Sequence, residues 1–118
     1  MIVKDEEPVI RRCLSCVKCF ADEIIVIDTG SQDQTAAISR EMGALVDTFA
    51  WNDDFAAARN SSFSRATKDY IFWLDADDVI DEVNQRKLCE LKQHLDPSVD
   101  VVMMHYAMAH AKGATPIV

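Results

Sequence analysis

The sequence predicts an α/β fold, with a mostly parallel sheet and alternating helices on both of its faces. Two observations lead to this prediction. First, five short apolar runs alternate with segments in which apolar residues recur at helical spacing. Second, the runs within residues 23–28 and 70–74 are rich in β-branched or aromatic residues, as is typical of strands buried in a parallel sheet. We expect right-handed crossovers between these strands.

The chain begins with a strand, a helix and a second strand. Residues 1–3 predict a short first strand. Pro8 marks the start of the first helix, because proline is favoured in the first helical turn. The apolar face that follows comprises Ile10, Cys13, Leu14, Val17 and Phe20. The apolar run at residues 23–28 then predicts the second strand.

A second helix and a third strand follow. Ser31 and Gln34 match a capping box, which predicts that the second helix begins there. Gly43 is expected to end this helix, since glycine is favoured just after a helix C-terminus. Residues 44–49 predict the third strand.

The second half of the chain predicts two more helices and two more strands. After a loop at residues 51–54, a helix carries one face of Phe55, Ala58, Ser62, Phe63 and Ala66. Residues 70–74 are the most apolar run and predict a central strand. The last helix carries Leu88, Leu91 and Leu95. It ends before Pro97, residues 99–107 predict a fifth strand, and residues 108–118 are expected to be a loose tail.

Length and composition favour a single globular domain over residues 1–118. Of the 118 residues, 49% are hydrophobic, which is enough for a real core and argues against disorder. The net charge of −8 argues against binding a nucleic acid polymer, because such binding relies on Lys and Arg. No apolar run reaches the roughly 20 residues of a transmembrane helix, and no signal peptide pattern opens the chain. We expect a cytoplasmic protein, with a peripheral place on the inner face of the membrane as the alternative.

Three of the four cysteines have a spacing that imitates an iron–sulfur motif: Cys13, Cys16 and Cys19. On a helix, however, residues at this spacing drift around the cylinder and do not converge on one ion. We therefore expect buried or half-buried structural thiols in a reducing compartment, and the same for Cys89.

Acidic residues follow three of the predicted strands, where ligands bind in open α/β sheets. Asp28 closes the second strand, and Asp53 and Asp54 follow the third. Asp75 and Asp77, with one small residue between them, follow the fourth. Two carboxylates in such a turn can reach one Mg²⁺ or Mn²⁺ ion, which would neutralise a diphosphate leaving group. The alternative is that these aspartates form turns and cap helices.

Two further residues leave functional and structural alternatives open. Asp28 can accept hydrogen bonds from a base or ribose, or equally can belong to the first turn of the next helix. Arg59 can face a phosphate from the helix near the same edge, whereas position alone favours a structural ion pair.

Four motifs, in this order, resemble family 2 glycosyltransferases over about residues 1–80. They are Met-Ile-Val-Lys-Asp-Glu-Glu-Pro at residues 1–8, Asp-Glu-Ile-Ile-Val-Ile-Asp-Thr-Gly-Ser-Gln-Asp-Gln-Thr at 22–35, Trp-Asn-Asp-Asp-Phe-Ala-Ala-Ala-Arg-Asn at 51–60 and Trp-Leu-Asp-Ala-Asp-Asp at 73–78. The resemblance implies the GT-A fold and a nucleotide-diphospho-sugar donor. Asp5 stands where the family often has Asn.

The resemblance also implies roles for individual residues. It places Glu6 near the nucleotide base and ribose, Asp28 on the nucleoside and Arg59 near the donor. Asp75 and Asp77 match the D-x-D pair that holds the donor diphosphate through Mn²⁺ or Mg²⁺. Transfer of the sugar to a glycan, lipid or protein acceptor, with inversion, is then the expected activity, and a UDP-sugar is the favoured donor.

The family's catalytic domains are about twice as long as this chain, so we expect a domain that is incomplete at its C-terminus. The catalytic base is then expected beyond the end of the chain. Asp78 is the one candidate within it, and we expect it to cap a helix instead. An open sheet edge would favour pairing between copies as a homo-oligomer.

Two other interpretations stay open from the sequence. The chain can bind a nucleotide-sugar without transferring it. Residues 71–79 also fit the signature of a haloacid-dehalogenase-type phosphatase, in which Asp75 would be the nucleophile and Asp77 the general acid and base. A dinucleotide-dependent oxidoreductase is disfavoured, because no G-x-G-x-x-G motif follows a strand.

Overall fold

A computed structural model describes residues 1–107 of the chain. Its sheet has three parallel strands in the order β1-β2-β3, and β2 is central. The strands are β1 (Ile2–Val3), β2 (Ile25–Asp28) and β3 (Leu45–Thr48). The helices are α1 (Glu7–Val17), α2 (Thr35–Glu41), α3 (Phe55–Ser64) and α4 (Glu82–His94). The α/β class and the parallel sheet are therefore confirmed.

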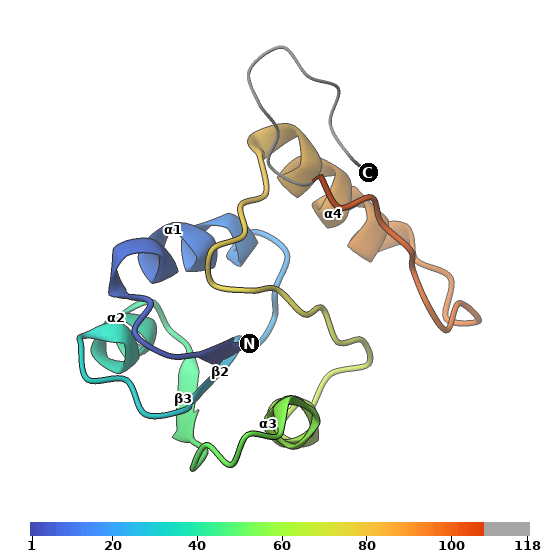
Figure 1. The fold of residues 1–118 in the computed structure, drawn as a ribbon. Coiled ribbons are helices and arrows are strands. Elements are labelled where there is room, and N and C mark those ends of the chain that lie inside the picture. Colours follow the sequence, from blue (N-terminus) through green and yellow to red (C-terminus); the bar gives the residue numbers. More distant parts are fainter. Residues whose placement is uncertain (108–118) are drawn as a thin grey trace.

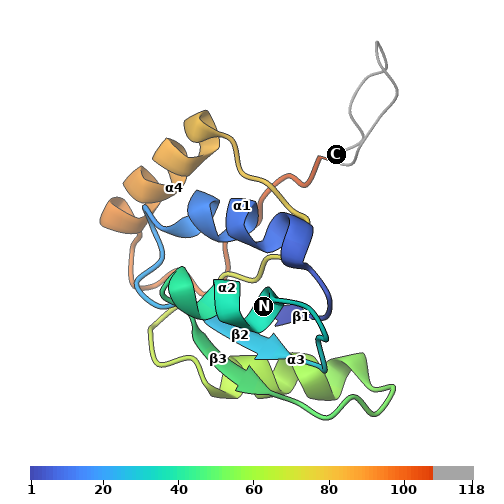
Figure 2. The same cartoon turned by 90° about the vertical axis from the view of Figure 1, so that its left-hand side faces the viewer.

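The helices lie on both sides of the sheet, as predicted. Figures 1 and 2 show α1 and α2 on one face and α3 on the other, with α4 beside α1 and away from the strands. The apolar core lies between the sheet and α1. It comprises Val3, Ile10, Leu14, Val26, Ala44 and Ala76. On the opposite face, Ile27 and Ala58 are fully buried.

The first helix forms where the apolar periodicity predicts it. Its buried residues are Ile10, Cys13, Leu14, Cys16 and Val17, which recur at the spacing of one helical face. Pro8 lies in the first turn, where its missing N–H costs no hydrogen bond. Cys13 and Cys16 are the buried thiols that we expected, but Cys19 lies beyond the helix and is exposed.

The predicted start of the second helix is wrong, because α2 begins at Thr35 rather than near Ser31. The Ser31 hydroxyl does not cap α2. It accepts a hydrogen bond from the Asp5 amide at 2.9 Å. Contacts between two loops thus replace the local capping box.

Gly43 ends α2 as predicted, and does so through a Schellman motif. The Gly43 amide donates to the Arg40 carbonyl, and the Ala44 amide donates to the Ser39 carbonyl, both at 3.0 Å. These two bonds require the left-handed conformation of Gly43, whose φ is +90°. The chain can therefore turn directly from α2 into β3.

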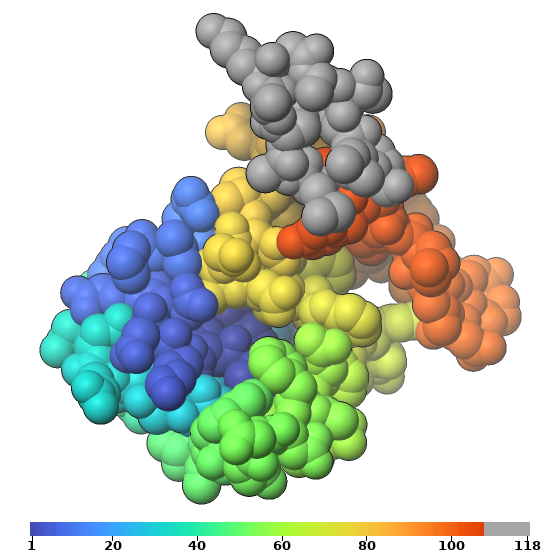
Figure 3. All heavy atoms as spheres, in the orientation of Figure 1, coloured from blue at the N-terminus to red at the C-terminus, as the bar shows by residue number. Residues whose placement is uncertain are grey.

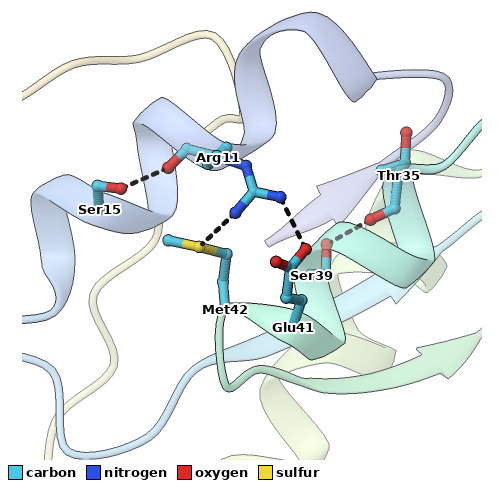
Figure 4. A network of polar contacts seen from close by, with 6 residues as sticks. All are labelled: Arg11, Ser15, Thr35, Ser39, Glu41 and Met42. Atoms are coloured by element: carbon cyan, nitrogen blue, oxygen red, sulfur yellow. Dashed lines mark hydrogen bonds and ion pairs between the residues drawn. The ribbon is translucent and has the colours of Figure 1, made fainter.

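Polar contacts join α1 to α2 at the surface (Figure 4). The Arg11 guanidinium donates to Glu41 at 2.7 Å and to the Met42 sulfur at 3.5 Å. Both charged side chains are more than half exposed, so this ion pair contributes well under about 1 kcal/mol. The apolar core, and not this contact, holds the two helices in place.

The two strands predicted in the second half are wrong. Residues 70–74 and 99–107 do not join the sheet, which ends at β1. Tyr70 to Trp73 stay 43–59% exposed. A strand is stabilised by neighbours that pair with its edge and cover its faces, and β1 offers an edge of only two residues.

The prediction that the last helix ends before Pro97 is confirmed, because α4 ends three residues before this proline. The Asp81 carboxylate caps it by accepting the Asn84 amide at 2.8 Å. Nevertheless α4 has no buried residue, so it is attached to the molecule less firmly than the other helices. The predicted loose tail, residues 108–118, lies outside the described residues. No helix within residues 1–107 is long and apolar enough to cross a membrane.

We predict that Gly43→Ala lowers the free energy of unfolding by about 1 kcal/mol, because an L-residue is disfavoured in the left-handed region. A Cβ at this position would meet no atom within 4 Å, so the backbone conformation alone accounts for the loss. Urea unfolding followed by circular dichroism measures it. Gly43→Asn is the control, and it should lose less than half as much, because Asn tolerates this conformation. Equal losses in the two variants would contradict the explanation.

Candidate functional site

Two loops at the carboxyl end of the sheet are joined by hydrogen bonds between backbone and side chains. The Asp5 carboxylate accepts the Gln32 amide at 2.7 Å, and the Thr35 hydroxyl accepts the Glu6 amide at 2.8 Å. The Glu7 carboxylate accepts the Gln34 amide at 3.0 Å. These bonds fix the loop after β1 against the loop after β2. Asp5 has a φ of +51°, a conformation that Asp adopts more readily than most residues.

Asp28 closes β2 and is 5% exposed. Its Oδ1 atom accepts the amides of Gly30 and Ser31 at 2.8 and 2.7 Å. This carboxylate therefore shapes the turn after the strand. The structural alternative from the sequence, a place in the first turn of the next helix, is wrong, because α2 begins only at Thr35. The Oδ2 atom of Asp28 accepts no hydrogen bond from the residues that the structure describes, so Asp28 keeps one oxygen for a further donor.

The acidic segment forms a reverse turn that is anchored by the small residue at its centre. Ala76 is 3% exposed and packs in the core with Val3 and Leu14. Asp75 and Asp77 flank Ala76 and are both exposed. The Asp78 amide donates to the Asp75 carbonyl, and the Asp75 amide donates to the Asp78 carboxylate, both at 3.0 Å. Burial of Ala76 thus presents two carboxylates to solvent from one fixed turn.

Side chains of α1 hold the backbone of this turn. The Cys13 thiol donates to the Asp75 carbonyl at 3.3 Å, and the Arg12 guanidinium donates to the Asp77 carbonyl at 3.3 Å. Burial raises the pKa of Cys13 to about 12, so this thiol stays protonated and keeps donating. Figure 3 shows the segment around residue 75, in yellow, between α1 in blue and α3 in green.

Glu6 lies within electrostatic range of Asp75 and Asp77 in the acidic turn. Partial burial raises the pKa of Glu6 above its ordinary value, and the charges of Asp77, Asp33, Asp5 and Asp75 raise it further. Glu6, Asp75 and Asp77 therefore share one electronegative region. Mutual repulsion within such a region is relieved when a cation binds.

Arg59 lies on α3 and stacks on Trp73, with its guanidinium carbon 4.8 Å from the ring centroid. This cation–π contact replaces the structural ion pair that position alone favoured. Burial lowers the pKa of the Met1 amino group; the nearby charge of Asp75 acts against this shift and that of Arg59 adds to it. Arg59 and Asp75 are thus both within electrostatic range of the start of β1.

Other aspartates near this edge have structural partners. Asp54 caps α3 by accepting the Ala57 amide at 3.0 Å, and Asp53 accepts the Trp51 indole N–H at 3.0 Å. We had expected Asp78 to cap a helix, and this prediction is wrong, because Asp81 caps α4 instead. Asp78 instead accepts a hydrogen bond from the Tyr106 hydroxyl.

Sequence reasoning missed three residues that support the turn: Arg12, Cys13 and Tyr106. Cys13 was recognised only as a core residue of the first helix, although its thiol has a polar partner. Tyr106 gave no signal, because it was assigned to a strand that does not form. The Asp78 hydrogen bond raises the pKa of Tyr106 to about 12.

The donor set suits one hard divalent cation that is completed by other ligands. Asp75 and Asp77 supply two exposed carboxylates, and Mg²⁺ is commonly bound by one or two carboxylates together with phosphate and water oxygens. Within residues 1–107 there is no cluster of three or more His, Cys, Asp or Glu side chains placed to hold an ion alone. One hollow, of about 350 Å³, lies at another part of the surface and is lined by Lys18, Glu23 and Lys68, among others.

Comparison with known proteins gives a consistent family. A TPR repeat-containing protein of Synechococcus elongatus is 48% identical over 96 residues, which are 81% of this chain and 23% of that protein. The SPbeta prophage-derived glycosyltransferase SunS of Bacillus subtilis is 33% identical over 109 residues, 90% of this chain and 26% of SunS. An uncharacterized glycosyltransferase of Rickettsia felis is 32% identical over 88 residues, 75% of this chain and 31% of the relative. The chain spans less than a third of each of these relatives.

The family model named Glycosyl transferase family 2 matches residues 1–113. This match includes both joined loops, the acidic turn and α3, whereas the phosphatase interpretation depended on residues 71–79 alone. On the strength of this match and of the glycosyltransferases among its relatives, the chain belongs to glycosyl transferase family 2.

Proposed function

We propose that this chain binds the nucleoside diphosphate part of a sugar donor, in a glycosyltransferase that passes the sugar to an acceptor hydroxyl. One observation carries the proposal. Ala76 is buried in the core while Asp75 and Asp77 on either side are exposed, within electrostatic range of Glu6. Family membership supports the same chemistry. The chain covers only part of its relatives, so the activity of the whole protein belongs to this proposal as well.

Asp75 and Asp77 would hold one Mn²⁺ or Mg²⁺ ion. When bound, such an ion neutralises the diphosphate and stabilises it as a leaving group. The two aspartates provide the negative charge, and the hydrogen bonds from Arg12 and Cys13 keep their backbone fixed. A fixed turn loses little conformational freedom on binding, which favours affinity.

The remaining site residues would bind the rest of the donor. Asp28 offers its Oδ2 atom to a ribose hydroxyl or a base N–H, and Glu6 lies on the neighbouring loop. Arg59 would leave Trp73 to pair with a phosphate oxygen, because a guanidinium forms strong hydrogen bonds with phosphate. We propose a UDP-sugar as the donor and inversion at the anomeric carbon, with a glycan, lipid or protein hydroxyl as the acceptor.

The metal site is tested with Asp75→Asn combined with Asp77→Asn. We expect Mn²⁺ with UDP to raise the melting temperature of the unchanged chain, and EDTA to reverse that rise. The double variant should bind Mn²⁺ and UDP at least about tenfold more weakly, which is about 1.4 kcal/mol, because both carboxylate ligands are lost. Isothermal titration calorimetry measures the affinity.

A matched control is Asp69→Asn combined with Asp100→Asn. Both residues are exposed, and the net charge changes by the same amount. This control should bind Mn²⁺ and UDP as the unchanged chain does. Equal weakening in the two double variants would mean that overall charge, and not a metal site, controls binding.

Arg59→Ala should weaken UDP binding by about tenfold but leave uridine binding unchanged, because the guanidinium would contact phosphate only. Arg65→Ala is the control, since Arg65 directly follows α3 and carries the same charge as Arg59. Its ion pair with Asp47 of β3 is exposed. Calorimetry with UDP and uridine distinguishes the two ligands. An equal loss of affinity for both ligands would show that Arg59 acts through the fold instead.

Asp78→Asn tests whether Asp78 supports the acidic turn without binding the metal ion. Without the charged acceptor, the pKa of Tyr106 should fall from about 12 towards its ordinary value of 10. Phenolate absorbance against pH measures this change in a Tyr70→Phe background, in which Tyr106 is the remaining tyrosine. Binding of Mn²⁺ and UDP should stay within about threefold, which is under 1 kcal/mol. A loss as large as in the Asp75 and Asp77 variant would make Asp78 a ligand.

A further inference from the structure

Two thiols meet where α4 lies beside the end of α1. Cys19 follows α1, and Cys89 lies in α4, 70 residues further along the chain. The Cys89 thiol donates to the Cys19 carbonyl oxygen at 3.4 Å, and the Cys19 thiol is 4.0 Å from the Gln85 carbonyl oxygen. The nearby Cys89 side chain is the main reason why the pKa of Cys19 is raised. The Cys89 sulfur thus lies against the main chain of Cys19.

These thiols differ from the other two in their access to solvent. Cys19 is exposed and Cys89 is partly exposed, whereas Cys13 and Cys16 are buried in α1. Reagents in solution therefore reach the pair before they reach the core thiols. Cys16 is buried and its thiol donates to the Arg12 carbonyl, so Cys16 serves as the unreactive thiol with which the reaction of the pair is compared.

The pair lies at the point where α4 is attached. No residue of α4 is buried, so apolar packing contributes little to holding it. Besides the contacts of the two cysteines, α4 is linked to the segment after α1 by the ion pair of Lys92 with Asp22 at 2.7 Å, in which both side chains are about half exposed. Exposed pairs of this kind are weak. A covalent bond between Cys19 and Cys89 would be the strongest link between α4 and the rest of the domain.

We propose that Cys19 and Cys89 form a disulfide on exchange with a small-molecule disulfide such as oxidised glutathione, and that this bond clamps α4 onto the end of α1. The Cys19 thiolate attacks one sulfur of the small disulfide, so that a mixed disulfide forms and one small thiol leaves. The Cys89 thiolate then attacks the Cys19 sulfur and releases the second small thiol. The two cysteines lose two electrons and two protons, and the small disulfide is reduced to two thiols.

The clamp would change the behaviour of α4 without requiring any donor or metal, so it is independent of the proposed function. Closing a loop of this length reduces the entropy of the unfolded chain, which raises the melting temperature. It would also slow local opening of α4, because the helix can no longer separate from α1. Reduction by a thiol reverses both effects.

The test uses the 118-residue chain, incubated with oxidised glutathione at pH 8 to 9, as the reacting species is the thiolate. After free thiols are blocked with N-ethylmaleimide in denaturant, peptide mapping by mass spectrometry should find a Cys19–Cys89 disulfide and labelled Cys13 and Cys16. The melting temperature should rise by several degrees, amide exchange in α4 should slow, and dithiothreitol should restore the original values. Accumulation of a stable glutathione adduct on Cys19, or a disulfide between other cysteines, would overturn the proposal.

Two serine variants complete the test. Cys89→Ser should stop the reaction at the mixed disulfide on Cys19, with no rise in melting temperature. Cys16→Ser keeps a donor for the Arg12 carbonyl and should form the Cys19–Cys89 bond at the unchanged rate. A markedly faster reaction in Cys16→Ser would show that the thiols react through general loosening of α1 and not as a pair.

Discussion

Burial of Ala76 in the core is the contact on which the candidate site depends. Residues 70–74 pair with no strand, so the acidic turn takes its position from this one side chain, against Val3 and Leu14, and from the bonds to α1. Because protein interiors are close-packed, a larger residue at this buried position would be crowded, and glycine would leave a gap. The small residue between the two aspartates is therefore needed for core packing as well as for the spacing of the two carboxylates.

A second constraint comes from the parallel sheet. The carboxyl ends of β1 and β2 meet at one edge, and the loops that follow are fixed to each other by side chains that accept backbone amides. Most acidic residues of these loops are used in this way. Glu6 is an exception, because its main-chain amide is bound to Thr35 while its carboxylate responds to the neighbouring aspartates. Acids that hold the loops together and the acid proposed to bind the donor thus alternate within a few residues.

The first half of the fold could be predicted from the sequence because its signals are local. Helical periodicity located α1, a β-branched run located β2, and Gly43 located the end of α2. The start of α2 could not be predicted, since Ser31 is bonded to Asp5 and not to its own helix. The run at residues 70–74 has the composition of a strand, but strand formation needs neighbours that composition does not supply.

The site was predictable to a similar degree. The rule that ligands bind beyond strand ends placed Asp28 at the carboxyl end of the sheet, because Asp28 ends β2, whereas Asp75 and Asp77 follow a segment that forms no strand. The support for the turn could not be predicted, because Arg12 and Tyr106 reach it from 65 and 28 residues away in the sequence. The role of Asp28 in the turn could not be predicted either, because it depends on one carboxylate oxygen that accepts the Gly30 and Ser31 amides.

Because Arg59 stacks on Trp73, the intrinsic fluorescence of this tryptophan should report movement of the Arg59 side chain. The indole ring is 59% exposed, and its one charged neighbour in the cation–π contact is the guanidinium 4.8 Å away. A ligand that draws this guanidinium aside changes the environment of an emitting ring, and the emission changes with it. The other tryptophan, Trp51, lies on the loop before α3 and is bonded to Asp53, so replacing it with phenylalanine leaves a single-tryptophan protein for such measurements.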